Sequence, residues 1–493
     1  MDNGHLIGKQ VMELEIRDSK NSYALQQRVS DLVWNALVPE MERLFDRLVA
    51  PDEIVRLSRL ELDLGVISLE KKEMKDLVAR IIGLMEARCT EAIQRTTRED
   101  RTSRTERLRP VHQPIRGHHF NLWLYWLEHG SLPPYAVAPR PDWLNGVLET
   151  LALEDGAIEQ LRSLAKDRPL VLHRLVLQHD LEILKSLVEL YTGHSQTDLP
   201  DFFRELRSWR AGWRAKARQP AWRTLETELW KSVFQQVVLR RAKPSGSDLM
   251  QTLVRHPELW PYKSEFIGKP KRYAQRYPLL FKTFQKIKED DEGNENRVPA
   301  HRPGSQIKEK GPATPRTEVR ESMDDLVVPQ FLSHAGMVLL HPLLKRFFEK
   351  LGLLEDTGFK DFERQCRAVL LLHDLAGGGE KTADYALVLP KFLCGMPVNL
   401  PIDHTLRLTA FEKDEGTQLL QAVIDHWGVL GNTSPDGLRE GFLQREGKLI
   451  REAAGWKLFV EQKALDVLLD RLPWNLGLVK LPWMKELLYV EWR

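Results

Sequence analysis

The chain has 493 residues, of which 42% are hydrophobic and 29% charged, so it is too long for one small module and fits about three globular units. Its 72 Lys and Arg nearly balance its 70 Asp and Glu, and a net charge of +2 excludes recruitment of the whole chain to nucleic acid or an anionic membrane by its overall field. The three cysteines, Cys89, Cys366 and Cys394, are widely separated and provide no disulfide framework and no zinc-binding pair, which indicates a reducing cytoplasmic setting.

The first ninety residues predict a small α/β unit. Apolar and charged residues alternate from Met12 to Ile16 and again from Leu60 to Leu64, which is the period of two typical of a strand with one exposed face. Two helical stripes lie between these segments, and the most regular helical stripe of the chain runs from Met74 to Met85. We therefore predict the order strand, two helices, strand, helix for residues 1–90.

The centre of the chain predicts a helical region between two linkers. Residues 91–109 lose the apolar periodicity and carry many Arg, Thr and Glu, which indicates a charged linker. Residues 110–285 contain short helical stripes rich in Trp and Arg. Residues 286–325 open with an acidic run and contain four prolines and few large apolar residues, so burial cannot offset the entropy of ordering them. We expect a disordered or extended linker there.

Residues 326–493 predict a C-terminal helical unit with short strands. Alternation at Trp456–Val460 and at Leu488–Trp492 predicts two strands. The helical stripes of this unit are Leu344–Leu351, Leu419–Trp427 and Leu465–Leu472. The expected fold class is α+β and predominantly helical, with a small N-terminal α/β unit, a helical middle and a C-terminal helical unit with short strands.

The strongest local charge feature runs from Arg204 to Lys243, where eleven basic residues outnumber three acidic ones and four tryptophans are interleaved. Such a surface could stack the bases of a single-stranded nucleic acid and bind its phosphates. We favour a competing interpretation, in which Trp209 and Trp213 pack inward and the Arg face contacts water or an acidic protein wall, because no nucleic-acid-binding motif frames the segment. The candidate basic face comprises Arg204, Arg207, Arg210, Arg214 and Arg218.

Segments that could carry enzyme chemistry fail on spacing. Gly377–Thr382 is Gly-rich, but a phosphate-binding loop needs Gly directly before Lys-Thr, and Glu380 would place negative charge at the anion. His373 and Asp374 lack a second ligand pair at helical spacing, which favours a structural role. We expect a protein that is not an enzyme and holds no cofactor or metal.

The lack of a signal pattern after Met1 and of an 18-residue apolar run predicts no export signal and no membrane partner.

The sequence Leu-Pro-Trp occurs twice near the C-terminus, at residues 472–474 and 481–483. Pro fixes φ and an indole can anchor a turn, so structural anchoring is one interpretation of these corners. Paired corners beside a terminal strand could also present a docking surface. The candidate docking residues of the chain are Leu60, Leu62, Leu64, Gly65, Trp474, Trp483 and Trp492.

Several segments together have the pattern of a known family, densely at both ends of the chain and thinly in the middle. The N-terminal and middle segments are His5–Ile7, Leu25–Ser30, Arg59–Gly65 and Leu127–Pro133. The C-terminal segments are Leu340–Leu344, Leu353, Lys391–Gly395, Leu438–Leu449, Val460–Glu461 and the two Leu-Pro-Trp corners. In these segments the chain resembles the tape measure proteins of contractile injection systems, which are phage-tail-like particles.

The resemblance implies a structural protein that occupies the lumen of the growing tube, docks on the hub and spike of the baseplate, and sets tube length. It implies inner tube and hub or spike proteins as partners, self-association in the lumen as a further interaction, and a cytoplasmic location followed by incorporation into the particle. As one continuous helix the chain could span at most ~740 Å, although its scattered prolines and lack of heptads argue against one coiled coil. Two alternatives stay open: an assembly or cargo chaperone of the same particle and, with less support, a single-stranded nucleic-acid-binding protein.

Overall fold

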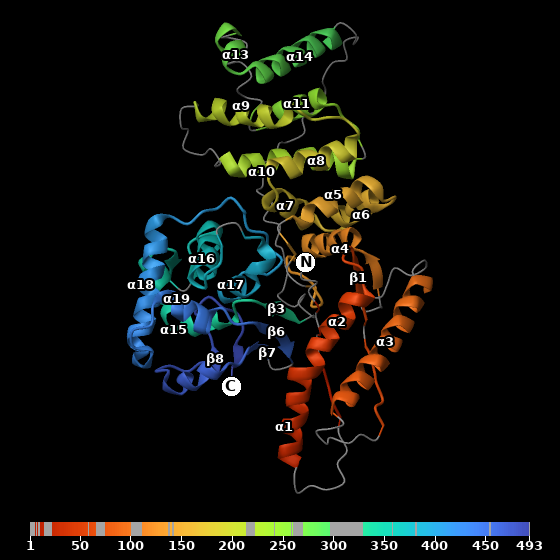
Figure 1. Cartoon of the computed structure of the whole chain (residues 1–493). Helices are drawn as coiled ribbons and strands as arrows, with labels where there is room; N and C mark the ends of the chain where they lie inside the picture. The colour runs from red at the N-terminus through yellow and green to blue at the C-terminus, as the bar shows by residue number, and fades with distance from the viewer. Residues whose placement is uncertain are drawn as a thin grey trace. The chain divides into compact units, whose positions relative to one another are not determined.

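The structure is a computed structural model of the whole chain, and Figure 1 shows its helices and strands. The described residues are 5, 7, 10–13, 22–57, 59–65, 74–99, 111–136, 139–140, 142–212, 222–240, 242–257, 259, 270–295, 329–356, 358–379, 382–452 and 455–492. The chain folds into two compact units. Unit 1 contains Met1–Trp123 and Tyr135–Leu153, and unit 2 contains Leu124–Pro134 and Glu154–Arg493.

Unit 1 is built on a helical core with one small sheet. Apolar residues of α2, among them Met41 and Leu44, pack against Leu77, Ile81 and Met85 of α3. Pro39 lies just after the π-helix η2 within an unbroken helical run, and the wider turn accommodates a residue that has no N–H to donate to the preceding turn. The elements are α1 (Ser22–Leu32), the π-helix η2 (Val33–Leu37), α2 (Val38–Leu48), β1 (Glu53–Arg56), α3 (Met74–Glu99), β2 (Val111–Pro114), the first part of α4 (Ile115–His129) and α5 (Trp143–Leu153).

The helices predicted for residues 1–90 are confirmed, but the second predicted strand is wrong. Leu60–Leu64 is extended and pairs with no strand among the described residues; its leucines are half-buried against the helical core, and Glu61 and Asp63 are exposed. The antiparallel pair of unit 1 forms instead between β1 and β2. The alternation therefore reflects packing on helices rather than on a sheet. In the first predicted strand, Met12–Ile16, the described residues 12 and 13 are not in a strand and the others lie outside the described residues.

Two helices run past the predicted boundaries of the linkers. Helix α3 continues to Glu99, and α14 (Pro278–Glu295) covers the first ten residues of the segment predicted as the second linker. Extending a nucleated helix by charged residues costs little, so polar composition alone does not end a helix. Residues 100–109 and 296–325 lie outside the described residues, and the linkers as such stay a prediction.

The first part of unit 2 is a stack of helices, which Figure 1 shows in layers with α13 and α14 at one end. The Asp180 side chain caps α8 and Gly193 ends it in the left-handed region, while Ser245 and Asp248 form a capping box on α11. The elements are α6 (Ala157–Asp167), α7 (Pro169–Gln178), α8 (Leu181–Thr192), α9 (Leu199–Ala211), α10 (Trp222–Phe234), the π-helix η3 (Gln235–Leu239), α11 (Gly246–Val254), α13 (Pro270–Arg276) and α14.

The C-terminal part of unit 2 packs short helices on a small sheet. The helical elements are η6 (Ala335–Leu340), α15 (His341–Lys350), α16 (Phe362–Leu375), η7 (Asp384–Leu387), α17 (Val388–Leu393), α18 (Ala410–His426), η8 (Gly428–Leu430), α19 (Pro435–Leu438), η9 (Arg439–Leu443) and η10 (Ala464–Arg471). The strands are β3 (Gln330–Leu332), β4 (Leu354–Glu355), β5 (Gly358–Phe359), β6 (Gly447–Glu452), β7 (Gly455–Val460), β8 (Leu478–Val479) and β9 (Leu488–Glu491).

The main sheet of this part has the strand order β3-β6-β7-β9-β8, with β7 and β9 parallel and the other pairs antiparallel. Leu449, Trp456 and Leu488 on its inner face are fully buried in the core that the helices cover. The two predicted strands correspond to β7 and β9 and are confirmed, as are the helices α15 and α18. The stripe Leu465–Leu472 forms the 3-10 helix η10 rather than an α-helix. The predominantly helical α+β class is confirmed.

Candidate functional site

A buried cluster of charges joins the helical stack of unit 2 to its C-terminal part. Asp384, at the start of η7, accepts from Arg174 on α7 (Nε to Oδ2, 3.2 Å) and from Lys391 on α17 (Nζ to Oδ2, 3.3 Å). The side chains of all three residues are 0% exposed. The second carboxylate oxygen accepts from the indole Nε1 of Trp126 at the end of α4. We call Arg174, Asp384 and Lys391, with Trp126 and Gln178, the buried junction.

The remaining donors of the buried junction find backbone carbonyls. The Arg174 guanidinium also donates to the carbonyls of Leu127 and Asn399, and Lys391 Nζ donates to Val398 O at 3.0 Å. A hydrogen-bonded network of this kind offsets the cost of taking ions out of water, which an unpaired charge could not. The junction therefore specifies how α7 packs on the loop that follows α17.

The Gln178 side chain, at the end of α7, bridges the same two parts of the unit. Its Oε1 accepts from the backbone N–H of Asp384 at 2.9 Å, and its Nε2 donates to the carbonyl of Ile402. The amide thus uses both of its functions at once, which also fixes its orientation.

One anion faces two cations in the buried junction, and this imbalance affects Lys391. Burial, opposed by Asp384 and assisted by the neighbouring Arg174, lowers the pKa of Lys391 to about 8. His179, which follows α7, packs its ring against Trp126 at 5.5 Å between centroids, and burial lowers its pKa to about 4. A neutral imidazole at this place adds no third positive charge.

A second set of contacts lies beside the junction, along residues 403–404. The guanidinium of Arg223, on α10, binds the Asp403 carboxylate through two hydrogen bonds of 2.7 and 3.0 Å. Burial alone would raise the pKa of Asp403, but the Arg223 guanidinium holds it below the ordinary value. The backbone N–H of His404 donates to Leu177 O at 3.0 Å. Bidentate Arg–carboxylate pairs add directional specificity, so these contacts fix the same interface.

The N-terminal candidate docking residues form part of the wall of unit 1. Leu60, Leu62 and Leu64 are half-buried against its core. Gly65 is exposed with φ at +60°, and its N–H donates to Asp63 Oδ1 at 2.9 Å. The positive φ explains why Gly occupies this turn. The docking role of these residues stays a prediction.

The C-terminal candidate docking residues turn their indoles into unit 2. Trp474 Nε1 donates to Leu339 O at 3.1 Å, and Trp483 Nε1 donates to Leu393 O at 2.7 Å. The Trp483 ring also packs against Phe359 at 5.1 Å between centroids, and Trp492 is buried. These contacts anchor the corners; whether the corners also dock a partner stays a prediction.

The candidate basic face is only partly described. Arg204 and Arg207 are exposed on α9, Arg210 is half-buried, and Arg214 and Arg218 lie outside the described residues. Arg204 pairs with Asp201 at 2.7 Å. Trp209 packs inward as predicted and is 2% exposed, whereas Trp213 lies outside the described residues.

The rejected enzyme motifs serve structural roles where they are described. His373 is buried, its Nε2 lies 2.9 Å from Thr382 Oγ1, and burial lowers its pKa to about 4. Its ring fills the space beside Gly378, where a Cβ would come within 2.1 Å of it. No group of three or more potential metal ligands occurs among the described residues.

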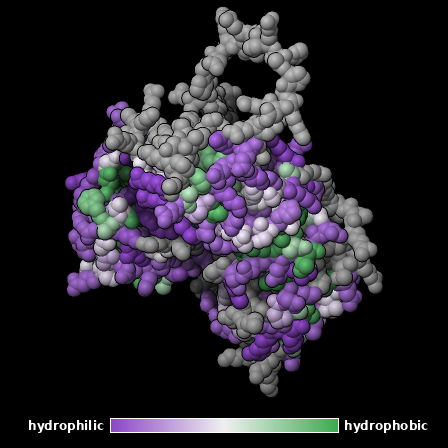
Figure 2. Space-filling view, turned by 90° about the horizontal axis from the view of Figure 1, so that it is seen from above, coloured by the Kyte–Doolittle hydropathy of each residue, from purple (hydrophilic) through white to green (hydrophobic). Residues whose placement is uncertain are grey.

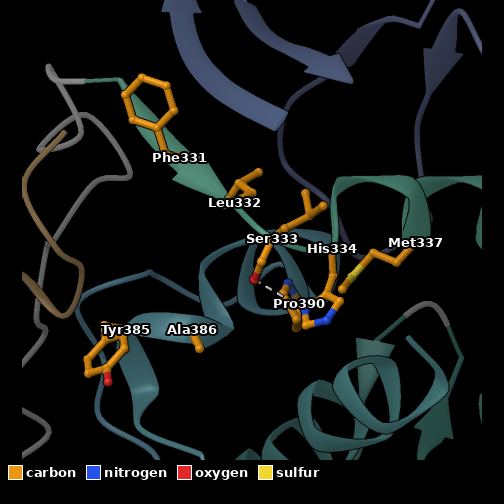
Figure 3. A pocket seen from close by; sticks show the side chains of 9 residues that line it. Phe331, Leu332, Ser333, His334, Met337, Tyr385, Ala386 and Pro390 are labelled. Atoms are coloured by element: carbon orange, nitrogen blue, oxygen red, sulfur yellow. Dashed lines mark hydrogen bonds between the residues drawn. The ribbon is translucent and has the colours of Figure 1, made fainter. Parts of the chain in front are cut away.

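A small cavity lies beside β3, as Figure 3 shows. It has a volume of about 30 Å³, enough for one or two water molecules, and Figure 3 shows Ser333 and His334 on its wall. Ser333 Oγ and His334 Nδ1 are 3.4 Å apart, and burial lowers the pKa of His334. This space is too small for an organic substrate.

The surface is mainly hydrophilic on one face. On the face shown in Figure 2, hydrophilic residues predominate and hydrophobic ones form small separate patches. Among the described helices, none combines the length and the apolar character needed to cross a bilayer.

The buried junction was not predicted from the sequence, although two local signals point to it. Arg174 stands in the apolar helix Pro169–Gln178, and Lys391 stands between Pro390 and Phe392 in another apolar run. A cation in such a run is rarely buried without a partner, so each position indicates a paired buried charge. The partner, Asp384, lies 210 residues from Arg174, and no local pattern identifies it.

Comparison with known proteins identifies a family. The family model of the contractile injection system tape measure protein matches residues 4–492. No curated protein and no solved structure matches the chain. Because the family match covers nearly the whole sequence, the protein belongs to the contractile injection system tape measure protein family.

Proposed function

We propose that the protein sets tube length in a contractile injection particle by occupying the lumen of the inner tube and docking on the hub and spike of the baseplate. The observation that carries the proposal is the family match over residues 4–492, which supports a structural role in the particle. The proposed partners are the inner tube and hub or spike proteins, and the proposed location is the cytoplasm and then the particle.

The architecture suggests that different parts of the chain dock and span the lumen. The N-terminal α/β unit and the C-terminal part of unit 2 are compact and would dock, and the region between them would span the lumen. A helix rises ~1.5 Å per residue and an extended chain ~3.3 Å, so the span depends on how much of the middle is extended. In this proposal the buried junction holds the helical stack on the C-terminal part until the tube grows.

Tube length in particles that carry a lengthened chain tests the proposal. Duplicating residues 296–325 adds 30 residues without interrupting a described helix. We expect tubes longer by roughly 45 Å if the insert is helical and roughly 100 Å if it is extended. Electron microscopy of negatively stained particles measures the change.

The matched control appends the same 30 residues after the C-terminal arginine, outside the span, and should leave tube length unchanged. Unchanged length with the internal duplication would contradict a length-setting role. Mass spectrometry of purified particles separates the chaperone alternative, because a chaperone that leaves after assembly would be missing from finished tubes.

A further inference from the structure

One stretch of the sequence carries the positive charge of the molecule. Residues 199–289 contain 20 Lys and Arg and eight Asp and Glu, a net charge of +12 in a chain whose total is +2. The rest of the chain is therefore net negative. Such a block creates a local field that the overall charge conceals.

The described acidic residues of this basic block are largely occupied within it. Glu205 accepts from the backbone N–H groups of Leu279 and Leu280 at the start of α14. The other occupied carboxylates lie on surface pairs or caps and leave little negative charge to compensate the exposed cations. They are Asp201 with Arg204, Glu226 with Arg223, Glu228 with Lys231, and Asp248 with Ser245 in the capping box of α11.

Exposed cations lie on α9, α13 and α14, and α14 contacts both of the other helices at the end of the helical stack, which Figure 1 shows with α13 and α14 outermost. The Arg276 guanidinium lies over the Tyr277 ring at 5.4 Å, and the Tyr277 hydroxyl donates to Ser208 O at 3.4 Å, next to Arg207. Lys282 is exposed on the first turns of α14. We call Arg207, Arg276 and Lys282 the cationic end.

Among the described residues of the same block, two tryptophans are buried and are not available to a nucleic acid. Trp209 is 2% exposed and Trp230 is 1% exposed, and Trp230 stacks on Phe203 with ring centroids 4.6 Å apart. Single-strand binding surfaces combine cations with exposed aromatic rings on which bases stack. Because Trp209 and Trp230 are buried, the exposed cations beside them fit an acidic protein surface better, where charges at the rim of an interface steer association without stacking.

We propose that the cationic end binds an acidic protein surface, namely the lumen wall of the inner tube. The inference rests on the proposed function, because that function places the helical stack inside the tube. Repeated acidic side chains on successive tube rings would offer weak, salt-sensitive contacts, which suit a chain that must stay in the lumen without blocking ring addition.

Binding of the full-length chain to purified inner-tube rings tests the inference. The variant Arg207→Gln/Arg276→Gln/Lys282→Gln removes three positive charges from the cationic end. We expect it to bind the rings about tenfold more weakly than the wild type near physiological salt, and the two to converge at high salt as screening removes the difference. Fluorescence anisotropy of the labelled chain across a salt series measures both effects.

The matched control Lys166→Gln/Arg346→Gln/Lys360→Gln removes the same charge from exposed positions outside the basic block and should bind within about twofold of the wild type. Equal binding by all three proteins, or wild-type binding that ignores salt, would overturn the inference. Tighter wild-type binding to single-stranded DNA than to the rings at the same salt would also overturn it. These outcomes leave the tube-length test untouched, so the inference can fail while the proposed function stands.

Discussion

Asp384 is the carboxylate on which the buried junction depends. Asp384→Asn keeps the size of the side chain but leaves Arg174 and Lys391 buried without a counter-charge. We expect the free energy of unfolding of unit 2 to fall by about 3–5 kcal/mol, the usual cost of breaking a buried ion pair from one side. Denaturant titration measures the loss, with the exposed Asp155→Asn as a matched control that should stay within about 0.5 kcal/mol of the wild type.

Lys391 provides the contrasting substitution at the same site. Burial lowers its pKa to about 8, which means that its charge is poorly compensated. Lys391→Met removes the surplus charge and leaves one unpaired carbonyl, Val398 O, so its cost should be well below that of Asp384→Asn. Equal losses for the two variants would show that the junction is held by shape rather than by its charge balance.

Histidines on α7, after it and on α16, the first half-buried and the other two buried, make unit 2 sensitive to mild acid. Burial lowers the pKa values of His173, His179 and His373 to about 4, below the ordinary 6.5. Between these values the unfolded chain binds more protons than the folded one, so the stability that is present above pH 6.5 falls as the pH falls toward 4. Each histidine contributes up to about 2 kcal/mol of loss between pH 7 and pH 5.

Thermal unfolding at pH 7 and pH 5 measures this dependence. We expect a clearly lower midpoint at pH 5, and a smaller shift in His179→Gln, because Gln does not titrate. The pKa values of Asp403 and Glu412 are held below their ordinary values, so protonation of these carboxylates lowers the stability only in more acidic solution. A midpoint that is equal at the two pH values would contradict the assignment of these histidines as neutral in the folded chain.

At the scale of elements, sequence patterns predict what is local. The stripes of α15 and α18 have a period that only a helix places on one face, and both helices form. The alternation at Leu60–Leu64 predicts an exposed and a buried face correctly but not what covers the buried one. The strand pair β1–β2 joins residues about sixty positions apart, and no local signal specifies such a partner.

The features of the candidate site can likewise be predicted from the sequence only where they are local. Inward packing of Trp209 follows from its helical spacing and is confirmed. Arg174, Asp384 and Lys391 are conspicuous only as charges in or near apolar runs, and their meeting depends on how α7 packs on a part of the chain that follows two hundred residues later. Long-range packing of this kind is a property of the fold, so the sequence marks the charges without pairing them.

At the scale of the whole molecule, a length-setting role requires unit 2 to extend, whereas the folded structure keeps it compact. A compact helical stack reaches far less than the ~740 Å of a fully helical chain, so a long span requires the stack to leave the C-terminal part. The buried junction and the Arg223–Asp403 pair would then have to open during assembly. Their hydrogen bonds are each worth little net free energy in water, so docking and ring contacts can compensate for their loss.

A disulfide across this interface tests whether it opens. The backbones of Leu177 and His404 are joined by a hydrogen bond of 3.0 Å, which brings them within reach of an engineered cystine in Leu177→Cys/His404→Cys. The native cysteines are buried, and burial raises the pKa values of Cys366 and Cys394, so they compete poorly for oxidation.

With purified components, we expect the oxidised double variant to assemble tubes of shortened or uncontrolled length, and a reductant to restore the wild-type length. Each single-cysteine variant, treated with the same oxidant, should assemble normally. Tubes of normal length from the fully oxidised double variant would show that α7 stays docked in the particle, and the span would then have to come from segments outside unit 2's helical stack.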